Sequence, residues 1–283
     1  MLRIAVPNKG SLSQAAQTML TEAGYLQRRD SRELVIADPE NAVEFFYLRP
    51  RDIAVYVGSG TLDIGITGRD LLLDSAGEAE EALSLGFAQS TFHFAGPQGV
   101  FTEIEQLQGQ RIATSYQHLV ERCLGEHGIE ASVVRLDGAV ESSIRLGVAD
   151  AIADVVETGN TLRAAGLEIF GQPLMRSEAI LIRQSSLQPE QEEALEMLSR
   201  RLRGVLVARQ YVMMDYDIRE DLLEAATAVT PGLEAPTVSP LSRPGWVAVR
   251  AMVPKSTTNP TMDRLYEVGA RAILVSPIQA ARL

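Results

Sequence analysis

A buried strand that runs into a polar turn and then a helix is predicted at residues 151–162, where the sequence reads AIADVVETGNTL. Residues 151–156 are a short apolar run that contains Asp154, a pattern typical of a buried strand in a parallel sheet. The turn and the start of the helix consist of Glu157, Thr158, Gly159, Asn160 and Thr161. The first N–H groups of a helix have no acceptor within it and lie at the positive end of its dipole, so this turn favours an anion such as phosphate. For the turn alone, an ordinary helix cap by Thr158 or Asn160 that binds no ligand is an equally good interpretation.

Asp154 makes the predicted anion site more specific. It lies near the carboxyl end of the strand, directly before the turn, where its carboxylate is placed to accept hydrogen bonds from both hydroxyls of a ribose. A ribose whose 5-phosphate occupies the turn would satisfy both features. The segment therefore predicts a ribose phosphate as the ligand.

Three segments of the chain resemble one enzyme family. The predicted turn is similar to a loop that binds 5-phosphoribosyl 1-pyrophosphate (PRPP). The motifs VPNKGSL (residues 6–12), RLDGAVE (135–141) and GVADAIADVVETGNTL (147–162) resemble those of the ATP phosphoribosyltransferases of histidine biosynthesis. The resemblance extends over essentially the whole chain and is to the long form of that family, which makes the ordinary-cap interpretation the weaker one.

The resemblance implies an α/β fold with a two-lobed catalytic core like that of periplasmic binding proteins, followed by a ferredoxin-like (βαββαβ) domain. It implies that N1 of ATP attacks C1 of PRPP and displaces pyrophosphate, giving N1-(5-phosphoribosyl)-ATP in the first step of L-histidine biosynthesis. It also implies Mg²⁺ as cofactor, carried mainly by the substrate phosphates without an assigned protein ligand. The resemblance further implies feedback inhibition by L-histidine and assembly into dimers and hexamers. AMP is a further candidate effector.

Three predicted strands in the N-terminal part each end in a charged turn. Lys9 follows the first strand, Arg49 the second, and the turn Gly68-Arg69-Asp70 the third, where its own N–H groups are offered to an anion. The strands cover residues 3–7, 43–48 and 62–67. Open α/β sheets bind their ligands at the carboxyl ends of the strands, so three such turns at one edge favour a binding site. Taken singly, each basic residue is more often a solvated or ion-paired surface residue.

The resemblance assigns roles to individual residues. Those assigned to catalysis are Lys9, Arg49 and Glu141, and those assigned to the nucleotide are Arg49, Gly68, Asp70 and Glu141. Those assigned to PRPP are Asp154, Glu157, Thr158, Gly159, Asn160 and Thr161. Shorter relatives carry an arginine where this chain has Ser11, so part of the positive charge is expected to come from elsewhere.

Composition limits the other classes of function. The formal charge of −11, with no run of Lys or Arg, argues against nucleic acid as a partner. No window approaches the ~18 uninterrupted apolar residues of a membrane span, and the N-terminus lacks the features of a signal peptide, so the cytoplasm is the expected location. The three histidines lack metal-ligand spacing. The single cysteine, Cys123, is predicted to be a small core residue.

The chain is predicted to divide into three parts. Residues 1–90, completed by a long helix at about 184–210, form lobe I, and residues 91–183 form lobe II with the PRPP loop. Residues 211–283 show the order βαββαβ and no catalytic constellation. By the resemblance they form the regulatory domain, whose residues near bound histidine are Asp217, Leu233, Thr237 and Ala272.

A different class of protein fits the same architecture. A two-lobed cytoplasmic binding or sensor protein would hold a small molecule in the same cleft without performing any reaction. It leaves unexplained why a ribose phosphate loop coexists with basic turns on the other lobe. It also predicts no turnover with PRPP.

Overall fold

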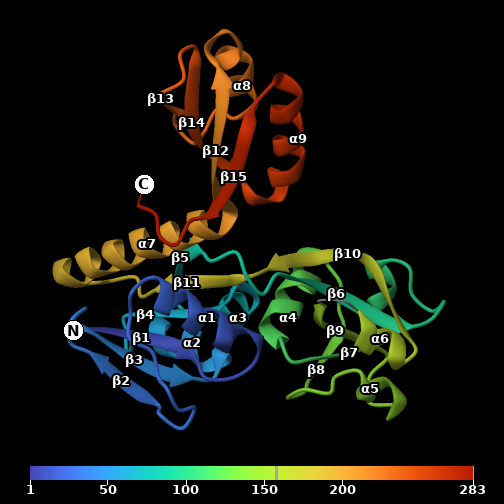
Figure 1. Ribbon diagram of the computed structural model, residues 1–283. Coiled ribbons are helices and arrows are strands. Elements are labelled where there is room, and N and C mark those ends of the chain that lie inside the picture. The colour runs from blue at the N-terminus through green and yellow to red at the C-terminus, as the bar shows by residue number, and fades with distance from the viewer. Residues whose placement is uncertain (157–158, 283) are drawn as a thin grey trace. The chain divides into compact units, whose positions relative to one another are not determined.

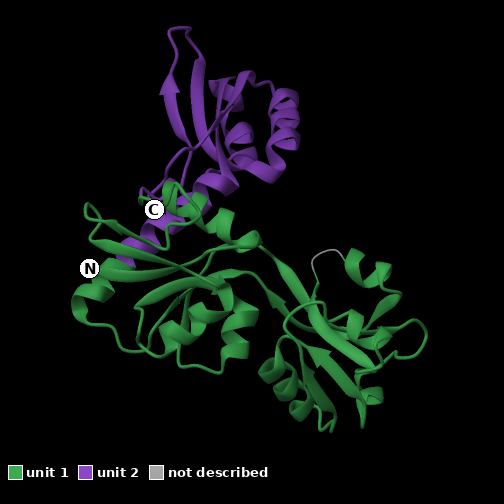
Figure 2. Ribbon diagram, turned by 90° about the horizontal axis from the view of Figure 1, so that it is seen from below, with its two compact units in different colours: residues 1–21, 25–195 green, residues 22–24, 196–283 purple. Residues whose placement is uncertain are grey.

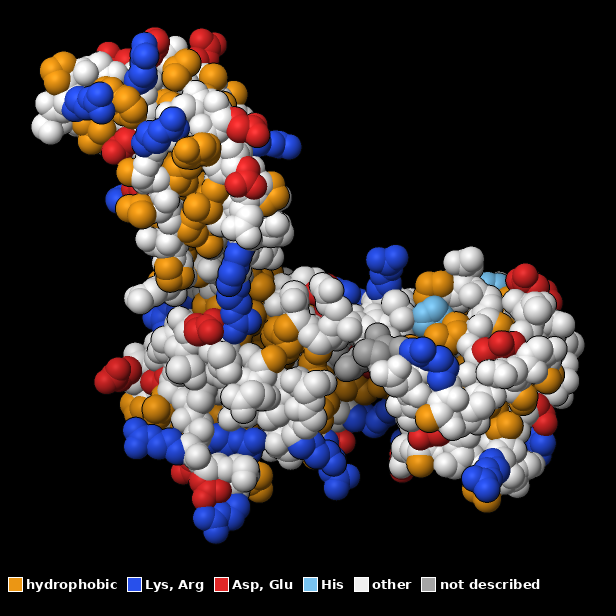
Figure 3. Space-filling view, turned by 45° about the vertical axis from the view of Figure 1, so that its right-hand side comes forward, with side chains coloured by type: hydrophobic (Ala, Val, Ile, Leu, Met, Phe, Trp, Pro, Cys, Tyr) orange, Lys and Arg blue, Asp and Glu red, His pale blue; other side chains and the backbone are white. Residues whose placement is uncertain are grey.

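The computed structural model describes residues 1–156 and 159–282. It divides into two compact units, of which the first comprises residues 1–21 and 25–195 and the second comprises residues 22–24 and 196–283 (Figures 1 and 2). On the described surface that Figure 3 shows, basic side chains lie among acidic and neutral ones instead of forming one basic stripe. No helix in the described ranges is long and apolar enough to cross a membrane.

The first unit contains a six-stranded sheet in the order β2-β3-β1-β4-β11-β5. Its strands are β1 (Leu2–Pro7), β2 (Val35–Asp38), β3 (Val43–Leu48), β4 (Ile64–Gly68), β5 (Glu80–Ser84) and β11 (Ala179–Arg183). The helices beside it are α1 (Ser11–Glu22), α2 (Pro50–Gly58) and α3 (Arg69–Ser75). Because β1, β3 and β4 are parallel, the turns that follow them share one edge of the sheet.

The close packing of α2 on this sheet depends on a glycine in β4. A Cβ added at Gly65 would lie 2.5 Å from Cγ2 of Ile53, a fully buried residue of α2. Pro50 begins α2 without losing a helical hydrogen bond. The sequence thus determines both where this helix begins and how near it lies to the strand.

The second sheet of the same unit resembles the first, since three neighbouring strands are parallel and the next strand is antiparallel to them. Its order is β10-β6-β9-β7-β8, with β6 antiparallel to its neighbours and β7, β8 and β9 parallel. The strands are β6 (Ser90–Pro97), β7 (Arg111–Thr114), β8 (Ser132–Arg135), β9 (Ala151–Val156) and β10 (Leu167–Ser177). The helices are η1 (Ile104–Leu107), α4 (Gln117–Glu126), α5 (Ser142–Arg145) and α6 (Asn160–Ala164). The two-lobed fold expected from the resemblance is therefore confirmed.

Two features of the first sheet differ from the expectation. We expected residues 91–183 to form the second lobe, but β11 pairs with β4 and β5 of the first sheet. The AILI run of β11 is fully buried in the first sheet. Burial of these apolar side chains stabilises the return of the chain to the first lobe before residue 184. The edge strand β2 was not predicted; it is only four residues long, and its apolar residues Val35, Ile36 and Ala37 are exposed or half-buried.

The second unit contains a four-stranded antiparallel sheet in the order β13-β14-β12-β15. Its elements after α7 (Pro189–Gln210) are β12 (Tyr211–Arg219), η2 (Glu220–Leu222), α8 (Leu223–Val229), β13 (Thr237–Pro240), β14 (Trp246–Pro254), η3 (Lys255–Thr257), α9 (Thr258–Val268) and β15 (Arg271–Pro277). The helices pack on one face through a core that includes Met214, Tyr216 and Leu265. This βαββαβ order confirms the predicted ferredoxin-like domain.

Candidate active site

A cavity of about 240 Å³ lies where the carboxyl ends of strands from both lobes of the first unit meet. The first lobe contributes the turn after β1, the start of α2 and the start of α3, and the second contributes residues after β7 and in β9. The lining includes Lys9, Ser11, Pro50, Asp70, Tyr116 and Val155. Two of the residues predicted for substrate binding, Lys9 and Asp70, therefore lie at one cavity.

Lys9 projects from a tight turn between β1 and α1. Gly10 makes the turn possible with a φ of +80°, and the Asn8 N–H donates to the Leu48 carbonyl over 2.7 Å, which joins the turn to the end of β3. The Lys9 side chain is exposed and has no ion pair within the described ranges. Its charge is therefore free to meet an anion in the cavity.

Arg28 supplies a second positive charge beside this turn. Its guanidinium lies 4.2 Å from the centroid of the Tyr47 ring and donates to the Asn8 carbonyl over 2.9 Å. Its remaining bonds go to neutral carbonyl and amide oxygens, so no carboxylate of the described residues neutralises it directly. Sequence reasoning missed Arg28, which lies outside any strand-end motif.

Asp70 joins the cavity to both lobes. It is buried at the start of α3, and its Oδ1 accepts a 2.6 Å hydrogen bond from the Ser177 hydroxyl. Its carboxylate also acts electrostatically on Tyr116 of the second lobe. Burial, followed by the charges of Asp70 and Asp154, raises the pKa of Tyr116, and Arg51 opposes the shift. Tyr116 therefore stays a neutral phenol at physiological pH.

Tyr116 and Arg51 are site residues that the sequence analysis did not select. The Arg51 guanidinium lies 4.9 Å from the Tyr116 ring centroid and pairs with Asp74 at 2.6 Å. Tyr116 follows β7 just as Lys9 follows β1, so the same strand-end rule would have found it. Arg51 lies in the first turn of α2, three residues after the end of β3, and is not part of the turn that directly follows the strand.

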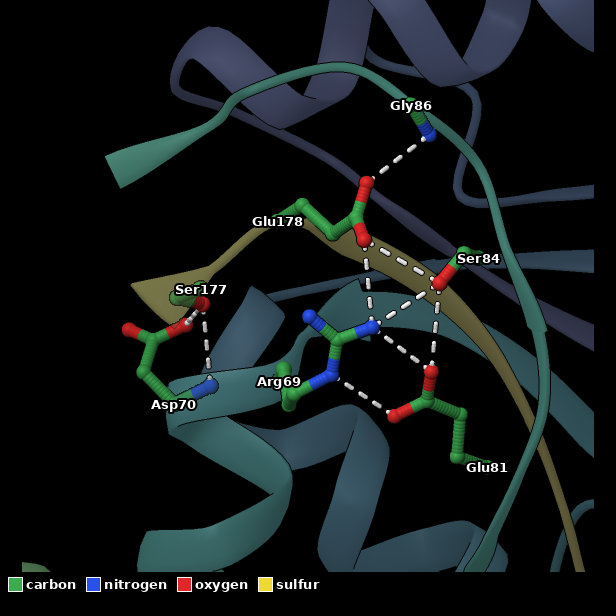
Figure 4. Close-up of polar contacts among 7 residues, drawn as sticks. All are labelled: Arg69, Asp70, Glu81, Ser84, Gly86, Ser177 and Glu178. Carbon is green, nitrogen blue, oxygen red and sulfur yellow. Dashed lines mark hydrogen bonds and ion pairs between the residues drawn. The ribbon is translucent and has the colours of Figure 1, made fainter. Parts of the chain in front are cut away.

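The prediction that the Gly68-Arg69-Asp70 turn offers free N–H groups to an anion is wrong. The Arg69 N–H donates to the Glu178 carbonyl over 3.0 Å, and the Asp70 N–H donates to the Ser177 hydroxyl over 3.1 Å. The Arg69 guanidinium is also occupied, by Glu81 and Glu178 (Figure 4). Ser177 and Glu178, more than a hundred residues later in the chain, satisfy this helix start, which the local sequence does not reveal.

Asp154 lies in β9 at the predicted strand end and is half-buried. Its Oδ1 accepts the N–H of Val155 over 2.8 Å. Burial raises its pKa above the ordinary value of 3.8, the charges of Glu141 and Asp70 add to this, and Arg51 and the Val155 N–H oppose it. These interactions place Asp154, Glu141 and Asp70 in one electrostatic environment.

The predicted phosphate turn is described in part. Glu157 and Thr158 lie outside the described residues. Gly159, with a φ of +69°, is the N-cap residue of α6, so Asn160 is not the cap. The Asn160 Oδ1 accepts a hydrogen bond from the Arg163 guanidinium over 2.8 Å. The first-turn N–H groups, including that of Thr161, have no acceptor inside the helix.

Arg49 and Glu141 occupy helix starts at the same edges. Arg49 is exposed at the N-cap of α2 and makes no ion pair within the described ranges, and Glu141 is half-buried at the N-cap of α5. Neither lines the 240 Å³ cavity directly. Gly68 is buried beneath Asp70, whose Oδ1 would lie 2.3 Å from a Cβ at that position.

The residues predicted to bind histidine lie on or beside the sheet of the second unit. Asp217 is on β12, and Ala272 is on the neighbouring strand β15 at a bulge, with a φ of +49° that is uncommon for alanine. Thr237 begins β13, and Leu233 lies in the loop before it, 41% exposed. The bulge changes the course of the backbone next to Asp217 and Ala272, whereas Thr237 lies on β13, at the opposite edge of the sheet.

Comparison with known proteins gives the family. A model described as ATP phosphoribosyltransferase matches residues 49–204, and a model described as the HisG C-terminal domain matches residues 208–280. The chain is 74% identical over 283 residues to an ATP phosphoribosyltransferase of Kocuria rhizophila and 68% identical over 286 residues to one of Arthrobacter sp. (strain FB24), with 100% of both chains covered in each case. The solved ATP phosphoribosyl transferase (HisG:HisZ) complex from Thermotoga maritima is similar with a TM-score of 0.64 and 26% identity, over 73% of this chain and 98% of that one. The chain therefore belongs to the ATP phosphoribosyltransferase family, in its long form with the C-terminal domain.

Proposed function

We propose that the chain joins N1 of ATP to C1 of PRPP, releases pyrophosphate and forms N1-(5-phosphoribosyl)-ATP, the first step of L-histidine biosynthesis, under feedback inhibition by L-histidine. The observation that carries the proposal is full-length family membership combined with a cavity lined by Lys9 and Asp70 at the meeting strand ends. The N1 lone pair forms the new bond to C1 while the bond from C1 to the pyrophosphate oxygen breaks. Positive charge grows on the ribose and negative charge on the leaving pyrophosphate.

The chain's own residues act by binding and by electrostatics, without a covalent nucleophile. Asp154 holds the ribose hydroxyls, and the turn from Glu157 to Thr161 holds the 5-phosphate with backbone N–H groups and threonine hydroxyls. Lys9 and Arg49 stabilise the phosphates. Glu141 orients the nucleotide, whose side of the site also includes Gly68 and Asp70. The unpaired state of Lys9 and Arg49 within the described ranges supports their roles.

Mg²⁺ is proposed as the cofactor. Asp70, Asp154 and Glu141 offer the carboxylate oxygens that Mg²⁺ prefers, while no group of three potential metal-binding side chains gathers in the described ranges. This donor set fits an ion carried mainly by the substrate phosphates, with Asp70 or Asp154 as an additional ligand. The ion would offset the negative charge of the departing pyrophosphate.

Residues 211–283 are proposed to bind L-histidine through Asp217, Leu233, Thr237 and Ala272. The bulge at Ala272 beside Asp217 supports this placement. AMP is proposed to compete at the nucleotide side. We further propose that the enzyme acts in the cytoplasm as a homo-oligomer, a dimer or hexamer, and binds neither nucleic acid nor membrane.

The proposed reaction is tested by incubating the chain with ATP, PRPP and Mg²⁺ and following the near-ultraviolet absorbance of N1-substituted adenine, with and without histidine. Turnover that histidine suppresses is expected. Ligand binding without turnover would favour the two-lobed binding or sensor protein. Turnover that histidine leaves unchanged would remove the proposed role of residues 211–283.

Asp217→Asn is expected to raise the histidine concentration for half-inhibition at least tenfold, because it removes a carboxylate that pairs with the ligand's ammonium or imidazolium group, a contact worth ~1.5–3 kcal/mol. Activity without histidine should stay within about twofold. Asp215→Asn is the matched control, since Asp215 lies on the same strand but pairs with Arg250 at 2.7 Å. Equal loss of inhibition in both variants would contradict the assignment of Asp217.

A further inference from the structure

The two segments that join the lobes of the first unit differ in length. Leu85–Gln89 connect β5 to β6, whereas Glu178 alone connects β10 to β11. Ser84 is opposite Ile180 and Ser90 is opposite Ser177, so five residues bulge out opposite two. Gly86 and Ala88 within this bulge have φ values of +69° and +52°. The second value is sparsely populated for alanine and persists only where neighbouring structure holds it.

The Glu178 side chain holds this bulge closed. Its Oε2 accepts the Gly86 N–H over 3.2 Å, and its Oε1 accepts the Ser84 hydroxyl over 3.1 Å and the Arg69 guanidinium over 3.2 Å (Figure 4). The Glu178 side chain is 19% exposed; its bond to Arg69 is partly buried, whereas its bonds to Gly86 and Ser84 lie at the surface. Backbone bonds between Ala179 and the residues Leu85 and Phe87 complete the contact. Together with these backbone bonds, the Glu178 carboxylate links the longer segment to Arg69 at the start of α3.

The same region reaches the active-site cavity at two points. Ala88 of the bulge lines the cavity, as does Asp70. Asp70 is held by Ser177, the residue before Glu178, through hydrogen bonds of 2.6 and 3.1 Å. A change in the bulge would therefore move Ala88 in the wall of the cavity. It would also move the end of β10, where Ser177 holds the Asp70 carboxylate.

We propose that Glu178 is a positioning residue for the reaction: it clamps the bulge Leu85–Gln89 and so sets the separation of the two strand edges that bind the two substrates. The inference rests on the proposed function. Glu178 acts through Gly86, Ser84 and Arg69 and does not line the cavity that contains Lys9 and Asp70. Without it the bulge gains conformational freedom, which both substrates must then remove on binding.

Glu81 provides a matched control for this role. It binds the same arginine more extensively, with bonds of 2.8 and 2.7 Å to the Arg69 guanidinium, and is 33% exposed. It lies within β5 and makes no bond to the bulge within the described ranges. Loss of Glu81 therefore weakens the ion-pair network without releasing the connecting segments.

Steady-state kinetics of Glu178→Ala, Glu178→Gln and Glu81→Ala test the proposal. Glu178→Ala is expected to raise the KM of ATP and of PRPP together by about tenfold, with kcat within about threefold, since loss of hydrogen bonds to a charged group has an effect of this size. Glu178→Gln keeps one acceptor oxygen for the Gly86 N–H, and its amide nitrogen can donate to the Ser84 hydroxyl oxygen, so this variant should recover part of the loss. Glu81→Ala should leave both KM values within about twofold. Equal effects of Glu81→Ala and Glu178→Ala, or unchanged KM values in Glu178→Ala, would overturn the proposal.

A distance measurement keeps this test separate from the test of the reaction. Spin labels on Ser59→Cys and Gln98→Cys in a Cys123→Ala background place one exposed label on each lobe. The distance distribution is expected to be broader with Glu178→Ala than with Glu81→Ala. If the unmodified chain shows no turnover, the proposed reaction fails while this comparison still decides the clamp. Identical distributions in the two variants would reject the clamp even if turnover is normal.

Discussion

Asp154→Asn is expected to raise the KM of PRPP about 100-fold while the KM of ATP stays within about threefold. The variant loses the charge of the group that accepts from the two ribose hydroxyls, and charge-assisted hydrogen bonds are worth ~1.5–3 kcal/mol each. A 100-fold change corresponds to ~2.7 kcal/mol. Adding Thr161→Val should increase the effect on PRPP further. Initial rates measured with each substrate varied in turn provide the test.

Asp150→Asn is the control for this prediction. Asp150 lies at the other end of β9, and its pairing with Arg111 over 2.8 Å lowers its pKa to about 2. Its replacement should leave both KM values nearly unchanged. Equal rises for ATP and PRPP in Asp154→Asn, or the same rise in Asp150→Asn, would contradict the ribose-binding role.

The pH dependence of PRPP use should follow the shifted pKa of Asp154. Burial raises that pKa above 3.8, so the carboxylate takes up its proton at a higher pH than an exposed aspartate does. The acid limb of kcat/KM for PRPP is therefore expected at a higher pH than an exposed aspartate would give, and it should be lost in Asp154→Asn. A profile with an unchanged acid limb in the variant would assign that limb to another group.

The same shift predicts an effect on stability of the opposite sign. A carboxyl whose folded-state pKa is raised binds its proton more tightly in the folded than in the unfolded state, so stability falls as the pH rises from the ordinary value through the raised one. At pH 7 the charged Asp154 destabilises the fold. Asp154→Asn should thus raise the melting temperature while it impairs PRPP binding, a trade-off expected of a group kept for function.

The local sequence pattern was sufficient to predict those elements whose own residues carry the pattern of a strand or helix. The apolar run 151–156 correctly predicted β9, in which Asp154 lies two residues before the end of the strand. The βαββαβ order of the C-terminal domain followed from alternating patterns and turn residues alone. In both cases short segments carry the hydrophobic periodicity of the element that they form.

Prediction failed where distant segments decide the chemistry. The N–H groups of Arg69 and Asp70 looked free because their acceptors, Glu178 and Ser177, lie more than a hundred residues away. The placement of β11 in the first sheet has the same cause, since a buried apolar strand does not indicate which sheet receives it. Such errors occur where tertiary contacts satisfy groups that the local sequence leaves open.

Lys9→Met is expected to lower kcat by about 100- to 1,000-fold with a much smaller change in either KM. The loss of one preorganised group that stabilises charge developing in the transition state has an effect of this size. Lys9 lines the cavity and makes no ion pair within the described ranges, so its full charge is available to the leaving pyrophosphate. Single-turnover measurements at saturating ATP and PRPP isolate this step.

The chain offers an unusual control for the lysine, because it contains only two, Lys9 and Lys255. Lys255 lies in η3 of the second unit, so Lys255→Met should leave kcat unchanged. Lys9→Arg keeps the charge and should recover part of the rate, although its planar fork is less well matched to the Gly10 turn. If Lys9→Met kept full kcat, the charge opposite the pyrophosphate would have to come from other cations, and Arg28, whose hydrogen bonds go to neutral oxygens beside the same turn, would be the first to replace.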